Sequence, residues 1–133
     1  MKSTARFLDG VRFQADVRGH RIASDLTVEN KGTDAGISPP EFLLVSLSTC
    51  AGYYALEYLR GRKLLTDGLT VEVTAEKLKP PARLGNFRIE VTVPNLPAEH
   101  EALLLRAVTS CLIHHTLTTP SAIETVIHVP VTV

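Results

Sequence analysis

The stretch from Ser38 to Gly61 constrains the fold more than any other part of the chain. Ser38 can cap a helix, Pro39 suits the first helical position, and Glu41 falls three residues after the cap. Arg60 suits the negative end of a helix dipole. The pattern therefore predicts a helix that runs to about Gly61 and is about 35 Å long, close to the full width of a domain of this size.

The predicted helix is apolar almost all round. Its main apolar face would carry Leu43, Leu44, Leu47, Cys50, Ala51, Tyr54 and Tyr58. Because polar residues interrupt the run, we interpret it as a buried helix and not as a membrane span. One sheet can cover only one side of such a helix, so we expect a second copy of the chain to cover another side, which gives a homodimer.

The residues before this helix alternate as short strands. Residues 5–8, 11–17 and 21–24 predict a three-stranded meander with turns at Asp9-Gly10 and at residues 18–20. Turn-forming residues then predict a loop up to the helix.

The residues after the helix predict a second hairpin, a second helix and a last strand. Residues 69–76 and 86–93 alternate with period two on either side of a proline-containing break. Pro97 opens a helix that would carry Cys111 on its apolar face, with a short helical turn over residues 112–118. Residues 126–133 predict a strand, at a sheet edge because of Pro130. The order of elements is α+β, and the length fits one domain over residues 1–133.

Charge and cysteine content restrict the partners. The chain has 14 basic and 14 acidic residues and a formal net charge of zero, without a basic stripe, so neither nucleic acid nor an anionic membrane is an expected partner. Residues 1–6 lack the apolar core of a secretory signal. We therefore expect a cytoplasmic protein whose two cysteines are reduced, and any disulfide between them would be transient and chemical.

Cys50 and Cys111 are the candidate reactive residues. If the two predicted helices pack side by side the cysteines can meet, although a disulfide needs Cα atoms within about 7 Å. The alternative is that both are buried and act as small hydrophobic residues.

A reactive Cys50 would need a nearby cation. A thiol attacks peroxide as the thiolate, and a free thiol has a pKa of about 8.5. Cys50 lies too far into its helix for the dipole to help. Arg12, Arg18 and Arg21 are candidate cations, and Glu41 could orient the guanidinium. Glu41 could instead serve only the capping box, and Arg18 could be a solvated turn residue.

The segment Cys111-Leu112-Ile113-His114-His115 raises the alternative of a zinc site. Adjacent histidines point in different directions and the spacings match no common zinc pattern, so His114 or His115 is better explained by capping or core hydrogen bonds. The three tyrosines of the first helix are interpreted as core and interface residues that could also wall an apolar pocket.

Two motifs resemble those of the OsmC/Ohr family. Residues 36–50, Gly-Ile-Ser-Pro-Pro-Glu-Phe-Leu-Leu-Val-Ser-Leu-Ser-Thr-Cys, are similar to the family's helix-opening motif. Residues 111–117, Cys-Leu-Ile-His-His-Thr-Leu, resemble its second motif, with Leu112 where proline is usual. Residues 13–25 are similar to its N-terminal hairpin. The likeness extends from about Phe7 to the end of the chain.

This resemblance implies an intertwined homodimer in which antiparallel sheets pack around two long helices, with two active sites at the subunit interface. It implies thiol-dependent reduction of organic hydroperoxides, and possible activity on hydrogen peroxide, without metal, haem or flavin. Cys50 would become a sulfenic acid, Cys111 would resolve it as a disulfide, and an external dithiol would reduce that disulfide. Arg18 matches the activating arginine best, with Arg12 and Arg21 as alternatives, and Glu41 matches the carboxylate that orients it. The alternative function is a non-catalytic dimer of the same fold that binds a small apolar ligand.

Overall fold

The structure, a computed structural model, describes residues 1–132. It is a mixed α+β fold with antiparallel sheets, which confirms the predicted class. The chain forms, in order, β1 (Thr4–Asp9), β2 (Arg12–Val17), β3 (His20–Ser24), η1 (Val28–Asn30), α1 (Pro39–Gly61), β4 (Thr70–Leu78), β5 (Arg83–Thr92), η2 (Ala98–His100), α2 (Glu101–Thr109) and α3 (Leu112–Thr118).

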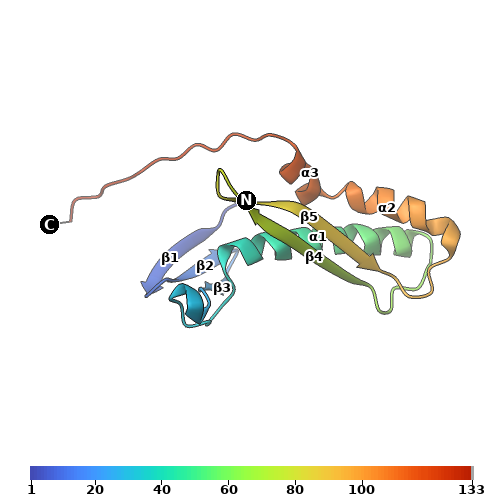
Figure 1. The fold of residues 1–133 in the computed structure, drawn as a ribbon, viewed down its shortest axis with the longest axis horizontal. Coiled ribbons are helices and arrows are strands. Elements are labelled where there is room, and N and C mark those ends of the chain that lie inside the picture. Colours follow the sequence, from blue (N-terminus) through green and yellow to red (C-terminus); the bar gives the residue numbers. More distant parts are fainter. Residues whose placement is uncertain (133) are drawn as a thin grey trace.

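The three N-terminal strands form the predicted meander, in the order β1-β2-β3 (Figure 1). Phe7 pairs with Phe13, and Ala15 pairs with Ile22, so these side chains share one face of the sheet. The aromatic rings pack edge to face at 5.8 Å, yet Phe7 is 63% exposed and Phe13 is 42% exposed. The apolar face of the meander is therefore largely uncovered within one protomer.

A buried aspartate organises the loop between the meander and α1. Asp25 is 1% exposed, and its carboxylate accepts hydrogen bonds from the hydroxyl and amide of Thr33 and from the amides of Leu26 and Ala35. These bonds, led by the Thr33 hydroxyl, lower the pKa of Asp25 to about 2. The amide of Asp25 donates to Ile37, which links this loop to the residue just before the helix cap.

Helix α1 begins and ends where the sequence predicts. The amide of Ser38 donates to a carboxylate oxygen of Glu41 at 2.9 Å, and the side chain of Ser38 accepts from the amide of Glu41, which together form a capping box. The hydroxyl of Ser38 also donates to the same carboxylate oxygen, at 2.8 Å. By length and composition α1 could cross a membrane, a property that it shares with core helices of soluble proteins. It packs against β4, β5, α2 and α3.

The second sheet and the helices enclose a small core. In the β4–β5 hairpin Val71 pairs with Val91, and Val73 pairs with Ile89, on the face toward the helices. The opposite face carries polar residues such as Glu72 and Glu90. The buried cluster against this sheet consists of Ala51, Ala55, Tyr58, Leu59, Leu104 and Val108. Both strands are longer at the hairpin loop than expected, because β4 ends at Leu78 instead of residue 76 and β5 begins at Arg83 instead of residue 86.

The second helix differs from the prediction at its end. Helix α2 stops at Thr109, and Cys111 lies between α2 and α3 instead of on the face of a helix. Its backbone, with φ −59° and ψ 137°, is extended, as is usual for a residue that precedes a helix. The expected helical turn over residues 112–118 is present as α3.

The predicted final strand is wrong for the residues that the structure describes. Residues 126–132 form no strand, and Val133 lies outside the described residues. All residues from 119 to 132 are exposed, and they extend away from the body of the molecule (Figure 1). We call residues 119–132 the C-terminal arm. A strand forms only against a partner edge, and the arm pairs with none among residues 1–132.

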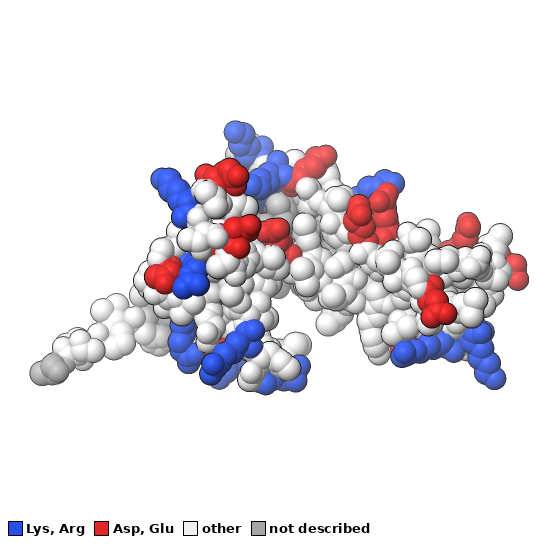
Figure 2. Space-filling model, turned by 90° about the horizontal axis from the view of Figure 1, so that it is seen from below, with Lys and Arg blue, Asp and Glu red and all other residues white. Residues whose placement is uncertain are grey.

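Charged side chains are distributed without a single dominant sign. On the face shown in Figure 2, basic and acidic side chains occur together toward both ends of the body, and an uncharged area lies between them. This matches the balance of 14 basic and 14 acidic residues.

Candidate active site

The structure brings Cys50 and Cys111 together. Cys50 lies in the middle of α1 and is half-buried, whereas Cys111 is fully buried at the start of α3, which packs on α1. Both are free thiols, and they are close enough that Cys50 contributes to the raised pKa of Cys111.

Local structure determines the environment of the Cys111 thiol. Burial, followed by the hydrogen bond with Cys50, raises the pKa of Cys111 above its ordinary value. The backbone amides of His114 and Ile113 donate toward the same sulfur and act in the opposite direction. Cys111 is therefore kept as a neutral thiol at neutral pH, while two donors stand ready for any negative charge that forms on it.

The candidate arginines all lie on the meander, and they differ in their partners. Arg12 makes two hydrogen bonds to Asp9, at 2.8 and 2.9 Å, and Arg21 lies 3.6 Å from Asp16. Arg18 is exposed in the β2–β3 turn, where its φ of 49° is left-handed and Gly19 follows with φ 83°. Among residues 1–132 Arg18 makes no side-chain hydrogen bond or ion pair, and none of these arginines hydrogen-bonds to Cys50 or Cys111.

Glu41 occupies its alternative position, the capping box of α1. The amide of Ser38, followed by its hydroxyl, lowers the pKa of Glu41, so the carboxylate is ionised. Within the described residues its hydrogen-bond partners are on Ser38 and not on an arginine. Within residues 1–132 the two thiols are therefore neighbours, whereas neither the candidate arginines nor Glu41 hydrogen-bonds to them.

Two apolar hollows lie between β5 and the helices α1, α2 and α3. The smaller has a volume of about 250 Å³ and is lined by Leu47, Phe87, Ile89, His114, Leu117 and Thr118. Leu47 is one helical turn before Cys50, and His114 is three residues after Cys111, so the lining includes a near neighbour of each cysteine in the sequence but neither cysteine itself. Its lining matches an apolar organic group better than a charged one.

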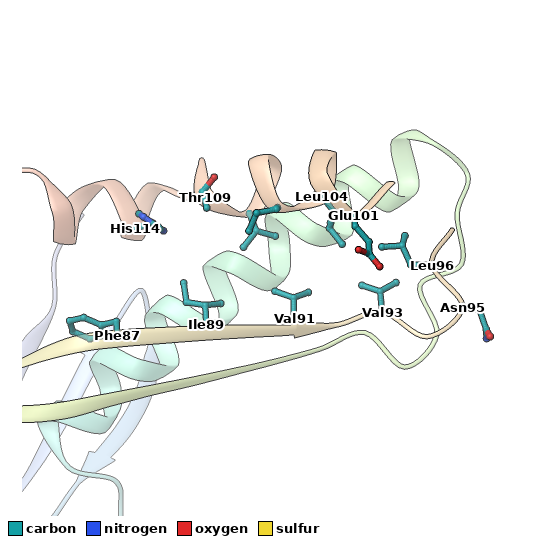
Figure 3. Close-up of a pocket in the computed structure, with 12 residues that line it drawn as sticks. Phe87, Ile89, Val91, Val93, Asn95, Leu96, Glu101, Leu104, Thr109 and His114 are labelled. Atoms are coloured by element: carbon teal, nitrogen blue, oxygen red, sulfur yellow. The ribbon is translucent and has the colours of Figure 1, made fainter. Parts of the chain in front are cut away.

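The larger hollow, of about 610 Å³, runs between β5 and α2. In Figure 3 the side chains of Phe87, Ile89 and Val91 project from β5 toward the helices, Val93 continues the row just after the strand, and His114 lies at the other end of the row. Phe87, Ile89 and His114 line both hollows, so the two share a wall at this end.

The histidines and tyrosines take structural positions. Residues 1–132 contain no group of three or more Cys, His, Asp or Glu that could hold a metal ion. His114 is half-buried and His115 is exposed. The hydroxyl of Tyr58 lies 2.8 Å from Nδ1 of His100, and Arg62 stacks over its ring at 3.8 Å. The residues that line the two hollows include no tyrosine, so the expected tyrosine wall is not found there.

Two features of the site were missed from the sequence. The apolar lining comes from Phe87, Ile89 and Leu117, and the first two could have been found from the period-two pattern of their strand. The amide donors toward Cys111 could have been found by treating it as the residue that caps the short turn over 112–118.

Comparison with known proteins identifies the fold. The chain resembles a candidate osmotic stress induced and detoxification response protein from Psychrobacter arcticus, with a TM-score of 0.79, 22% identity and 87% of each chain covered. It also resembles an OsmC-like protein from Mycoplasma pneumoniae, with a TM-score of 0.72, 22% identity, and 89% of this chain and 86% of that chain covered.

A third similar structure is an organic hydroperoxide resistance protein, OsmC, from Legionella pneumophila, with a TM-score of 0.62, 13% identity and 90% of each chain covered. No curated protein matches the sequence significantly. The family described as OsmC-like protein matches residues 32–126, which include α1, the β4–β5 hairpin and both cysteines. The chain therefore belongs to the OsmC-like protein family.

Proposed function

We propose that this protein is a thiol-dependent peroxidase that reduces organic hydroperoxides in the cytoplasm. The observation that carries the proposal is the pair of neighbouring free thiols, one half-buried and one fully buried, with an apolar hollow lined by Leu47 and His114, close to them in the sequence. The more accessible Cys50 is the thiol that peroxide can reach. Hydroperoxide resistance proteins among the similar structures support the same reaction class.

The chemistry proceeds in balanced steps. The Cys50 thiolate attacks the outer peroxide oxygen, the O–O bond breaks, and protonation of the leaving oxygen releases an alcohol, which leaves Cys50 as a sulfenic acid. Cys111 then attacks the Cys50 sulfur, water leaves, and the disulfide forms. An external dithiol returns both cysteines to thiols and becomes a disulfide itself. No metal, haem or flavin takes part in these steps.

Arg18 is the proposed activating cation. Arg12 and Arg21 already lie near carboxylates of the meander, whereas Arg18 is exposed and makes no ion pair within residues 1–132. A guanidinium beside Cys50 would favour the thiolate over the thiol. Glu41 would orient Arg18 with the carboxylate oxygen that Ser38 does not occupy.

The site is completed in a homodimer. The protomer exposes 10475 Å², whereas a compact monomer of 14.5 kDa exposes about 6,900 Å², an excess of about 3,600 Å². The excess includes the arm, where Ile123, Ile127, Val129 and Val131 are 81 to 90% exposed, and the uncovered face of the meander. Covering such surface with a second copy would join the meander to the thiol pair across the interface.

A thiol titration tests the function. One equivalent of cumene hydroperoxide should remove both free thiols rapidly in the native sequence, and Cys50→Ser should abolish peroxide consumption. Cys111→Ser should stop the reaction at a sulfenic acid, trapped by dimedone at Cys50. Two thiols that persist after exposure to hydroperoxide would refute the peroxidase.

A non-catalytic dimer that binds a small apolar ligand is the second candidate. The larger hollow favours it, because its walls are mostly aliphatic side chains of β5 and α2. It predicts unreactive thiols and saturable binding of an apolar fluorescent probe such as anilinonaphthalene sulfonate, which Leu104→Ala would weaken. If hydroperoxide removes both thiols rapidly, ligand binding is not the only function of the protein.

A further inference from the structure

The two sulfur atoms differ sharply in access. Cys111 is 0% exposed within a single chain, whereas Cys50 is half-buried. Assembly with a second copy can only remove more surface, so Cys111 is inaccessible in every oligomeric state that keeps this fold. A disulfide between them therefore presents one reachable sulfur atom and one that is closed off.

We infer that reduction of the disulfide has a fixed direction, in which the external thiol attacks Cys50 and Cys111 is the leaving sulfur. This inference rests on the proposed function, and it specifies the step that the function leaves open. Cys50 then meets both the hydroperoxide and the reductant, and Cys111 never meets a molecule from solution.

The surroundings of Cys111 suit a leaving sulfur. The amides of His114 and Ile113 donate toward it, and such donors stabilise the negative charge that forms as the S–S bond breaks. Burial acts against that charge, because it raises the pKa of Cys111. An attacking thiol must contact the sulfur directly, and Cys111 is 0% exposed whereas Cys50 is half-buried, so access decides the direction.

Reduction of the disulfide takes two thiol exchanges. A thiolate of the dithiol forms a bond to the Cys50 sulfur, the Cys50–Cys111 bond breaks, and its electron pair goes to Cys111, which takes up a proton. The second thiol of the reductant then attacks the reductant's own sulfur in this mixed disulfide. Cys50 leaves as a thiolate, and the reductant departs as an oxidised disulfide.

The test uses the full chain with its disulfide formed by diamide, so that it does not depend on peroxide chemistry. Brief reaction with 2-mercaptoethanol and quenching with N-ethylmaleimide should leave mercaptoethanol on Cys50 and the maleimide on Cys111, as read by peptide mass spectrometry. We expect the adduct on Cys50 in about tenfold excess or more, the ratio that a local opening of about 1.4 kcal/mol at Cys111 would produce. An adduct mainly or equally on Cys111, or no disulfide with diamide, overturns the inference.

A matched pair of variants checks access directly. The thiol left in Cys50→Ser should react with Ellman's reagent at least about tenfold more slowly than the thiol left in Cys111→Ser, and the two rates should converge in denaturing urea. Equal rates in the native proteins contradict the inference. If the diamide-formed disulfide is reduced at Cys50 but hydroperoxide does not oxidise the thiols, the proposed function is refuted and the direction of reduction is not.

Discussion

The exposed C-terminal arm leads to the most informative prediction. Ile127 is 83% exposed, so within a protomer its side chain has almost no packing to lose. If the arm docks as a strand on a second copy, Ile127 shares its docked face with Ile123, Val129 and Val131, by the period of two. Ile127→Ala should therefore weaken association and leave the folded protomer almost unchanged.

The size of the effect follows from burial and symmetry. Truncation of a buried isoleucine to alanine costs about 2–5 kcal/mol. A two-fold dimer contains two arms, so the dissociation free energy falls by about 4 kcal/mol at the low end, which weakens dimerisation about a thousandfold. Sedimentation over a dilution series measures this constant.

His128→Ala is the matched control. His128 neighbours Ile127 in the sequence but points to the opposite side of an extended segment, and its change should alter the constant only slightly. Docking of the arm on a second copy is refuted if Ile127→Ala and His128→Ala both have the same dissociation constant as the native sequence.

Three further predictions concern stability and the role of Glu41. Leu104→Ala should lower the free energy of unfolding by about 2–5 kcal/mol in urea titrations, because Leu104 is 6% exposed. The control Leu105→Ala, at a 65% exposed position, should change it by less than about 0.5 kcal/mol. Equal losses in the two variants would contradict the assignment of Leu104 to the core. Asp25 has a pKa of about 2 against an ordinary 3.8, so its contribution to the free energy of unfolding is complete above pH 3.8 and is lost as the pH falls toward 2. Asp25→Asn should therefore flatten the pH dependence of the free energy of unfolding in that range. An unchanged slope in the variant would contradict this role of Asp25. Glu41→Gln can keep the capping box, so it should slow hydroperoxide reduction without shifting the urea midpoint, and parallel losses of rate and stability would mean that Glu41 only caps the helix.

Elements with strong local signals could be predicted from the sequence. The capping residues Ser38 and Glu41 defined the start of α1, and period-two alternation with short turns defined the meander and the β4–β5 hairpin. These patterns reflect interactions between near neighbours, which a single sequence contains. The nearness of Cys50 and Cys111 was expected only as a possibility, because it depends on how α3 packs on α1.

Features that depend on distant contacts could not be fixed in this way. Residues 126–133 have the composition of a strand, but the described part finds no sheet edge in its own protomer. Cys111 keeps helical spacing with Leu104 and Val108, yet α2 ends at Thr109 because the chain turns there to place α3 on α1. The choice among Arg12, Arg18 and Arg21 depends on which carboxylates lie nearby, and strand pairing decides that.

The buried carboxylate of Asp25 has a consequence for how the two halves of the chain are oriented. Its hydrogen bonds close the loop over residues 25–35, and its amide holds Ile37 just ahead of α1. The side chain of Asp25, together with the backbone bridge between Ser24 and Ile37, therefore holds the connection between the meander and the long helix. A substitution of Asp25 would change the orientation of the intact meander relative to α1. A residue of the meander that contacts a second copy would then be displaced, and the displacement would be larger the farther the residue lies from Asp25.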